Sequence, residues 1–215
     1  MKFIAPILKL ANNDVTVACS AGSDSIAVAH FLKTKYPKIN LKCFHYNHKL
    51  REQNNVMEEN VRWFCRNENI PLTISRRCLE VDSGTSEADL RSLRYAAMHN
   101  LGNVITGHHL DDYIESYLFN CFNGVPEYLP IPLRTIYKEN LTILRPFAIT
   151  RKTEVRHYIE KNNLSMYVVE DETNEDDEIR RNWLRNILIP QINSKGYNLE
   201  TIVKKKLYDH VFKNF

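Results

Sequence analysis

Residues 14–25 read DVTVACSAGSDS, in which a β-branched run passes directly into small and hydroxyl residues. The run from Asp14 to Cys19 is typical of a buried strand, and Ile26–Leu32 has the apolar face of a helix. At such a junction, small residues let backbone N–H groups approach phosphate oxygens, and the N-terminus of a helix favours negative charge. The segment therefore predicts a phosphate-binding loop, with an ordinary N-capped turn as the alternative.

Strands and helices alternate through the rest of the chain at the spacing of βαβ units. We expect strands over Leu41–His45, Pro71–Ser75, Asn103–Thr106 and Leu141–Leu144. The expected helices cover Asn54–Glu68, Ser86–Met98, Asp111–Phe122, Thr150–Asn162, Asp177–Ile189 and Tyr197–Phe215, with Pro190 closing the fifth of them. This pattern predicts an α/β fold with a parallel sheet flanked by helices and a small, mostly helical C-terminal extension. We expect a nucleotide-binding core over residues 1–124 and a remainder of loop, strand and helices over 125–215.

Composition narrows the class of protein. The 215 residues are 43% hydrophobic and 26% charged, as in globular proteins, and no apolar run is long enough to cross a membrane. The N-terminal segment lacks the pattern of a secretory signal, so we expect a cytoplasmic protein that does not associate with membranes. Five cysteines without a C-x-x-C pair indicate reduced, mostly buried thiols.

Charge is unevenly distributed. The net charge is only +3, but residues 170–178 read EDETNEDDE, and residues 177–215 hold eight Lys or Arg against four Asp or Glu. A mildly basic C-terminal face is compatible with an RNA partner. A solvated helix surface explains the same charges.

Two polar clusters follow predicted strands or open predicted helices. Asn47 and His48 come after the second strand, at the edge where open α/β sheets bind ligands, and can contact a nucleotide or a base. The alternative is a turn with a solvent-facing histidine. Arg91 and Arg94 lie within one helical turn and repel each other unless an anion lies between them or acids flank them.

The densest polar segment, residues 106–115, reads TGHHLDDYIE. Asp112 and Glu115 are three residues apart on one helical face, a pair that suits a metal ion or an ammonium group. Helix capping by Asp111 alone is the alternative. A last cluster joins Asn174 to Arg181, Asn182 and Arg185, where a surface helix beside an acidic turn is the plain alternative.

The loop over residues 20–25 resembles the S-G-G-x-D-S signature of the PP-loop ATP pyrophosphatases, which cleave ATP between the α and β phosphates. Ala21 replaces the first glycine. Alanine is tolerable there if its φ angle is negative, although it narrows the room for polyphosphate. The loop is not a Walker A motif, because no lysine follows the glycine at that spacing.

The whole set of motifs resembles the tRNA(Ile)-lysidine synthase family. Its motifs N-H-x-x-R, A-R-x-x-R-Y, H-H-x-D-D-x-x-E-T, R-P and D-x-[ST]-N-x-D…R-N-x-x-R have counterparts here in the same order. These counterparts are Asn47-His48…Arg51, Leu90-Arg91…Arg94-Tyr95, His108-His109…Asp111-Asp112…Glu115, Arg145-Pro146 and Asp171…Asn174…Asp176…Arg181-Asn182…Arg185. The match runs from about Val15 to Pro190.

The resemblance implies a reaction on tRNA. ATP adenylates the C2 carbonyl oxygen of the wobble cytidine in an isoleucine tRNA with a CAU anticodon, and the amine of free L-lysine then displaces AMP. Implied catalytic residues are Asp24, Arg94, Asp112 and Glu115, of which the last two hold the lysine amine. ATP would lie on Ser20, Ala21, Gly22, Ser23, Asp24 and Ser25, with Mg²⁺ on Asp24. Further contacts to nucleotide, base or lysine fall to Asn47, His48, Arg91, His108, His109 and Asp111, and contacts to tRNA to Asn174, Arg181, Asn182 and Arg185.

Several features depart from the family pattern. Family chains carry C-terminal domains that help grip the tRNA, and we expect these to be absent here. Ser116 and Tyr113 replace the usual Thr and Gln, and Asn123-Gly124 replaces Arg-Gly. Two alternatives remain open: another PP-loop enzyme acting on tRNA, such as a thiolase, and a non-catalytic nucleotide- or RNA-binding module. An oligomer is possible.

Overall fold

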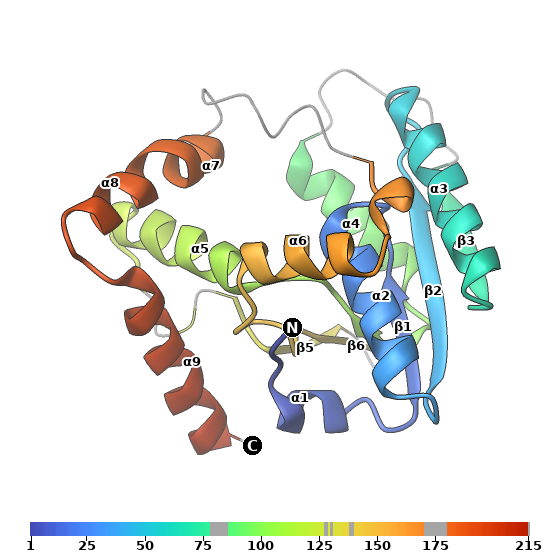
Figure 1. The fold of residues 1–215 in the computed structure, drawn as a ribbon, viewed down its shortest axis with the longest axis horizontal. Helices are drawn as coiled ribbons and strands as arrows, with labels where there is room; N and C mark the ends of the chain where they lie inside the picture. The colour runs from blue at the N-terminus through green and yellow to red at the C-terminus, as the bar shows by residue number, and fades with distance from the viewer. Residues whose placement is uncertain (78–85, 127–128, 130, 138–139, 170–179, 215) are drawn as a thin grey trace.

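A computed structural model describes residues 1–77, 86–126, 129, 131–137, 140–169 and 180–214 (Figure 1). Their strands form one sheet in the order β3-β2-β1-β4-β6-β5, in which only the β5–β6 pair is antiparallel. The strand bounds are β1 Asp14–Ala18, β2 Asn40–Asn47, β3 Leu72–Arg76, β4 Gly102–Ile105, β5 Arg134–Tyr137 and β6 Leu141–Leu144. The predicted α/β class with a mostly parallel sheet is confirmed.

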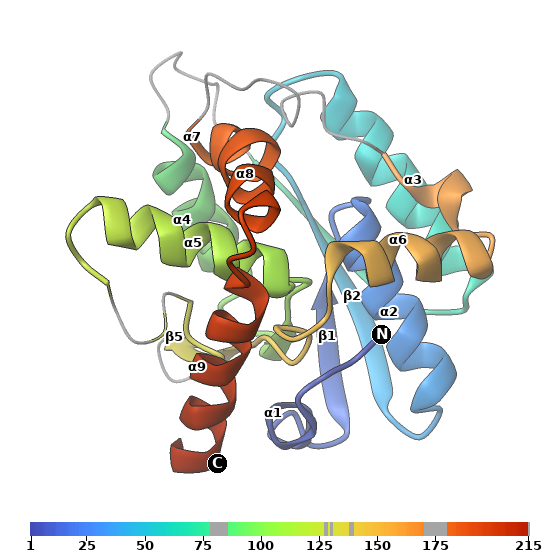
Figure 2. The same ribbon diagram turned by 60° about the vertical axis from the view of Figure 1, so that its left-hand side comes forward.

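Helices cover both faces of the sheet (Figures 1 and 2). They are α1 Ala5–Lys9, α2 Ser23–Lys35, α3 Gln53–Asn67, α4 Glu87–Ala97, α5 Leu110–Phe122, α6 Lys152–Lys161, the 3-10 turn η1 Ser165–Tyr167, α7 Arg180–Trp183, the π-helical segment η3 Leu184–Leu188, α8 Ile189–Ser194 and α9 Leu199–Asn214.

Alternating side chains along the strands divide the core in two. Cys43 and Ile105 belong to the larger cluster, which includes residues of α2, α3, α5, α6 and α9. Their neighbours Phe44 and Val104 belong to the smaller cluster under α4. Successive residues of a strand point to opposite faces, so both faces of this sheet are covered. The larger cluster contains side chains from residues before and after position 124 in the sequence. The expected division of the chain into a core over 1–124 and a remainder over 125–215 stays a prediction.

Helix α1, strand β5 and the short turn η1 were not predicted from the sequence. Helix α1 is one short turn, with a proline at its start. Strand β5 lies at the edge of the sheet, and three of its four residues are exposed, so it lacks the alternating pattern of a half-buried strand.

The prediction that Pro190 closes a helix was wrong. Pro190 lies in the first turn of α8, which continues to Ser194. Pro190 follows directly on the π-helical segment η3, whose bonding pattern differs from the ordinary i to i−4 bonds of an α-helix, so the helical backbone continues past the proline. The C-terminal helix α9 packs against α5 through Leu199, Val203, Leu207 and Val211, and the predicted helical extension is confirmed.

The prediction of free, mostly buried thiols agrees with the described part of the chain. Cys19, Cys43 and Cys65 are buried free thiols and Cys121 is a partly buried one, while Cys78 lies outside the described residues. No helix in the described ranges has both the length and the apolar character needed to cross a bilayer.

Candidate active site

The predicted phosphate loop and the residues from His108 to Glu115 meet at the carboxyl ends of β1 and β4. The chain leaves β1 for β2 on one side, and β4 pairs with β1 on the other, so the two connections diverge at this point. Open α/β sheets bind ligands at such a divergence. The phosphate loop follows β1, and the residues from His108 to Glu115 follow β4.

Hydrogen bonds within the loop fix its shape. The Ser25 hydroxyl donates to the Gly22 carbonyl at 3.0 Å and accepts from the Ser20 amide at 3.0 Å. Gly22 is the N-cap of α2, whose first residue is Ser23. The buried Ser25 therefore supports the loop from below, while Ser20 is exposed at its rim.

Ala21 adopts the backbone conformation that favours glycine. Its φ angle is +63°, so the condition of a negative φ under which alanine would be unstrained is not met. Gly22, in contrast, has an ordinary φ of −70°. The Ala21 carbonyl accepts a hydrogen bond from Val169 at 2.9 Å, which ties the loop to the segment after η1. The chain thus carries a strained, fully buried residue inside its candidate phosphate loop.

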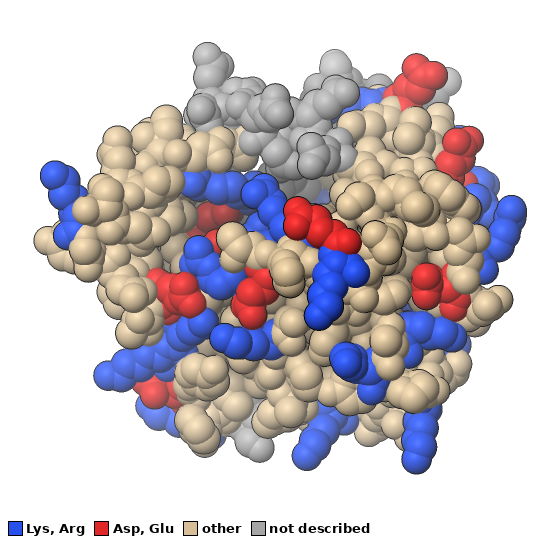
Figure 3. All heavy atoms as spheres, viewed as in Figure 1, with Lys and Arg blue, Asp and Glu red and all other residues tan. Residues whose placement is uncertain are grey.

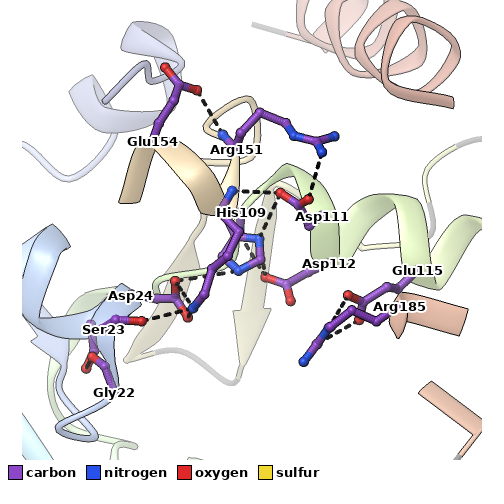
Figure 4. Close-up of polar contacts among 12 residues, drawn as sticks. Gly22, Ser23, Asp24, His109, Asp111, Asp112, Glu115, Arg151, Glu154 and Arg185 are labelled. Carbon is purple, nitrogen blue, oxygen red and sulfur yellow. Dashed lines mark hydrogen bonds and ion pairs between the residues drawn. The ribbon is translucent and has the colours of Figure 1, made fainter. Parts of the chain in front are cut away.

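Three carboxylates surround the buried side chain of His109 (Figure 4). Its Nε2 lies 3.5 Å from Asp24, and its Nδ1 lies 3.5 Å from Asp112 and 3.7 Å from Asp111. Asp112 also accepts from the His109 amide at 2.8 Å and so caps α5. Burial raises the pKa of Asp112, and the nearby charges of Glu115 and Asp24 add to the effect. The arrangement concentrates negative charge and suits a cationic ligand.

Two cations at the start of α6 face these acids. The Lys152 ammonium lies 2.7 Å from each carboxylate oxygen of Asp24 and 3.0 Å from the Ser23 hydroxyl. The Lys152 amide donates to Asp111 at 2.7 Å, and Arg151 pairs with Asp111 at 3.2 Å. Neither Arg151 nor Lys152 was predicted from the sequence to belong to the site. A signal was present, because cations in the first turn of a helix oppose its dipole and call for acidic partners.

Glu115 and Arg185, which were assigned different roles from the sequence, bind each other (Figure 4). The guanidinium donates to both carboxylate oxygens, at 2.7 and 2.9 Å. The Glu115 side chain is only 5% exposed and that of Arg185 is 41% exposed. Glu115 raises the pKa of Arg185. The pair joins α5 to η3, and π-helical segments often occur at functional sites.

The other three residues of the sequence cluster that contains Arg185 are Asn174, Arg181 and Asn182. Asn182 is buried, at 5% exposure. Asn174 and the Arg181 side chain fall outside the described residues, so their predicted contacts with tRNA stay predictions.

Two neutral histidines lie among arginines beside the acidic cluster. Burial, followed by the charges of Arg145 and Arg91, lowers the pKa of His108 to about 3. Burial and the charge of Arg94 lower the pKa of His48 to about 4. Both rings are therefore uncharged near neutral pH, and the arginines dominate this side of the site. The excess positive charge suits an anion, as the close spacing of Arg91 and Arg94 predicts.

Asn47 is directed into the fold. Its amide nitrogen donates to Glu58 at 3.0 Å and to Asn55 at 3.3 Å, and its oxygen accepts from the Lys49 amide at 2.8 Å. These bonds organise the turn after β2, and the predicted contact with a base stays untested.

The oxygen donors around Asp24 meet the needs of Mg²⁺. This ion binds proteins through one or two carboxylates and completes its coordination with water and substrate phosphates. Asp24 is a hard oxygen donor whose side chain is 30% exposed beside the N-terminus of α2. In the described residues, no three His, Cys, Asp or Glu side chains form a metal cage. The residues thus fit an ion that a phosphate substrate brings with it.

The chain belongs to the PP-loop domain family, whose sequence model matches residues 1–192. Within that family it is similar to tRNA(Ile)-lysidine synthases. It is 30% identical to the Thermotoga maritima enzyme over an alignment of 214 residues that covers 94% of this chain and 50% of the relative. It is also 30% identical to the Actinobacillus succinogenes enzyme over 92% of this chain and 47% of the relative. The chain therefore spans about half the length of these relatives.

Solved structures share the fold. A U34-tRNA thiolase from Methanococcus maripaludis superposes with a TM-score of 0.72 at 14% identity, over 98% of this chain and 80% of the thiolase. An NH3-dependent NAD synthetase from Campylobacter jejuni gives a TM-score of 0.51 at 15% identity, over 98% of this chain and 93% of the synthetase. At such low identity the likeness concerns the fold alone.

Proposed function

We propose that this chain catalyses lysidine formation on an isoleucine tRNA. ATP adenylates the C2 carbonyl oxygen of the wobble cytidine and releases pyrophosphate. The ε-amine of free L-lysine then attacks C2, the oxygen leaves with AMP, and the amine loses a proton. Adenylation turns a poor leaving oxygen into a good one. The observation that carries the proposal is the 30% identity to tRNA(Ile)-lysidine synthases over 94% of the chain.

The site has separate regions for the charges that this reaction brings together. The loop over residues 20–25 offers a helix N-terminus to the phosphates of ATP. Asp112 follows on α5 and can receive the ammonium group of lysine, whereas both carboxylate oxygens of Glu115 are held by Arg185. Arg91 and Arg94, which lie 5.2 and 5.8 Å from the Tyr95 ring centroid, add positive charge around His108, where an adenylate or an RNA phosphate would lie. Holding the amine and the activated base together provides the rate advantage of proximity.

The face of the protein that carries this site has a mixture of charges (Figure 3). Lys and Arg side chains lie interspersed with Asp and Glu across its middle and form no uniform basic surface. Two lysines of the basic C-terminal segment have partners within the chain: Lys204 pairs with Glu200 at 2.5 Å, and Lys206 lies 5.5 Å from the Tyr117 ring centroid. We infer that tRNA is recognised by individual charged side chains around the site. The proposed function places the protein in the cytoplasm, where tRNA is available.

The proposal is tested by incubating the full chain with Mg-ATP, isotopically labelled lysine and an isoleucine tRNA with a CAU anticodon. Mass analysis of the digested nucleosides then detects lysidine. A tRNA with uridine at the wobble position serves as the substrate control, since it lacks the cytidine. We expect label only in the cytidine-containing tRNA.

A matched pair of variants connects the activity to the site. Asp24→Asn removes the only acid of the phosphate loop and should abolish product formation. Asp14→Asn removes an equal charge from the exposed start of β1, at the opposite end of the strand, and should retain activity. ATP consumption without labelled tRNA would indicate another PP-loop reaction. The absence of both signals would favour the non-catalytic binding module.

A further inference from the structure

A lysine reaches the phosphate loop from a distant part of the chain. The loop itself contains no lysine, unlike a Walker A motif. The ammonium of Lys152 nevertheless contacts two consecutive loop residues, Ser23 and Asp24, across a sequence separation of 128 residues from Asp24. Its position at the first residues of α2 is where the oxygens of a bound polyphosphate meet the helix N-terminus.

The backbone around Lys152 is well anchored. It is the first residue of α6, and its amide donates to Asp111 at 2.7 Å. Helix α6 packs against α2, the helix that the loop opens. The Lys152 side chain retains 29% exposure and is therefore accessible from the site. Because the backbone of Lys152 is anchored and its ammonium group is accessible, the side chain can exchange one anionic partner for another.

We propose that Lys152 is the phosphate-binding lysine of this site and contacts the pyrophosphate end of ATP. In the absence of nucleotide its ammonium neutralises Asp24. Asp24 would hold the divalent cation that accompanies ATP, and the Lys152 ammonium would then be available to contact a β- or γ-phosphate oxygen. There it stabilises the negative charge that the pyrophosphate leaving group gains as the bond to the α phosphate breaks. The inference rests on the proposed use of ATP.

Binding measurements on the full chain distinguish this role from a purely structural one. Calorimetric titrations with ATP and with AMP, both in the presence of Mg²⁺, are carried out on wild type and on Lys152→Met. AMP lacks the β and γ phosphates. We expect the variant to bind ATP at least about tenfold more weakly, the loss of one charge-assisted bond, and to bind AMP as wild type does. Lys152→Arg should recover part of the ATP affinity.

Two further variants serve as controls. Lys161→Met removes the same charge from an exposed position at the other end of α6 and should leave both affinities unchanged. Asp24→Asn tests whether Lys152 acts only through Asp24. If it did, Lys152→Met would have no further effect in an Asp24→Asn background. The proposal requires a further loss of ATP affinity in that background.

Each outcome is decisive. Equal loss of ATP and AMP binding, or unchanged ATP binding in folded Lys152→Met, would overturn the role of Lys152 while leaving the proposed function intact. A wild-type chain that binds no ATP would overturn both. Thermal unfolding of every variant verifies that the titrated protein is folded, and Lys152→Arg keeps the comparison available if Lys152→Met does not fold.

Discussion

Gly107 lies directly against the backbone of Asp24. A Cβ atom at Gly107 would lie 3.1 Å from both the carbonyl carbon and the Cβ of Asp24. Carbon atoms in favourable contact are about 3.5–4.0 Å apart, so any side chain here would push the loop after β4 away from the phosphate loop. Gly107 therefore sets the separation between the acids on α5 and the nucleotide-binding loop.

Gly107→Ala is expected to weaken ATP binding several-fold, because Asp24 has to move to accommodate the methyl group. Gly102→Ala is the control, since its Cβ would meet no atom within 4 Å although its φ is +67°. The control should lose about 1–2 kcal/mol of stability from backbone strain while keeping its ATP affinity. Titration calorimetry and urea unfolding separate the two effects. ATP binding by Gly107→Ala at wild-type strength would contradict the assigned contact.

Ala21→Gly should destabilise the protein much less than other buried alanine-to-glycine changes. Releasing alanine from a φ of +63° returns about 1–2 kcal/mol, which offsets about 0.8 kcal/mol for the lost buried methyl group and about 0.5–1 kcal/mol for the backbone entropy that glycine loses on folding. Ala18→Gly in the regular strand β1 has no strain to release and should destabilise by about 1 kcal/mol. Chemical denaturation of both variants checks the prediction, which fails if Ala21→Gly destabilises the protein as much as Ala18→Gly does.

Glu115 and Arg185 should show a large coupling energy. Arg185→Gln leaves a buried carboxylate without its guanidinium and is expected to cost about 2 kcal/mol, less than a fully buried pair because Arg185 is 41% exposed. In the Glu115→Gln background the same change should cost much less. A double-mutant cycle of urea unfolding measures the difference. Additive effects would show that the pair contributes no net stability.

Lysine use should be lost as the pH falls. Burial raises the pKa of Asp112, so its carboxylate takes up a proton at a higher pH than an ordinary aspartate and then no longer attracts an ammonium group. We expect the KM for lysine to rise on acidification while the KM for ATP changes less. Asp112→Asn should have a high KM for lysine at every pH. A KM profile in Asp112→Asn that parallels the wild type would assign the titration to another group.

Glu58 should make stability sensitive to acid. Arg76, together with Asn47 and Arg62, lowers the pKa of Glu58 from 4.5 to about 2, against the opposing effect of burial. Because the folded-state pKa is depressed, this stabilisation is present above the unfolded pKa and is lost as pH falls from 4.5 toward 2. Glu58→Gln should cost about 2 kcal/mol at neutral pH and little at pH 2. Glu59→Gln, an exposed neighbour on α3, should show no such dependence; urea unfolding at a series of pH values tests both.

The sequence predicted those parts of the site that depend on local order. Asp112 and Glu115 lie on α5, and the phosphate loop joins β1 to α2, because hydrophobic periodicity and helix capping determine both segments. The contact of Lys152 with Asp24 and the close approach of Gly107 depend on packing between distant segments. The cations at the start of α6 indicated a need for acidic partners, but no local pattern identified which acids these are. The φ angle of Ala21 could not be predicted for a related reason: the loop bonds of Ser25 and the contact with Val169 determine it.

The pairing of Asp24 with Lys152 across 128 residues also bears on the order of events during synthesis. A growing polypeptide exposes its phosphate loop on the ribosome long before Lys152 has been made. Until that lysine arrives, the carboxylate of Asp24 lacks its cationic partner. The phosphate loop therefore acquires its complete set of contacts only after the chain has been made beyond residue 152.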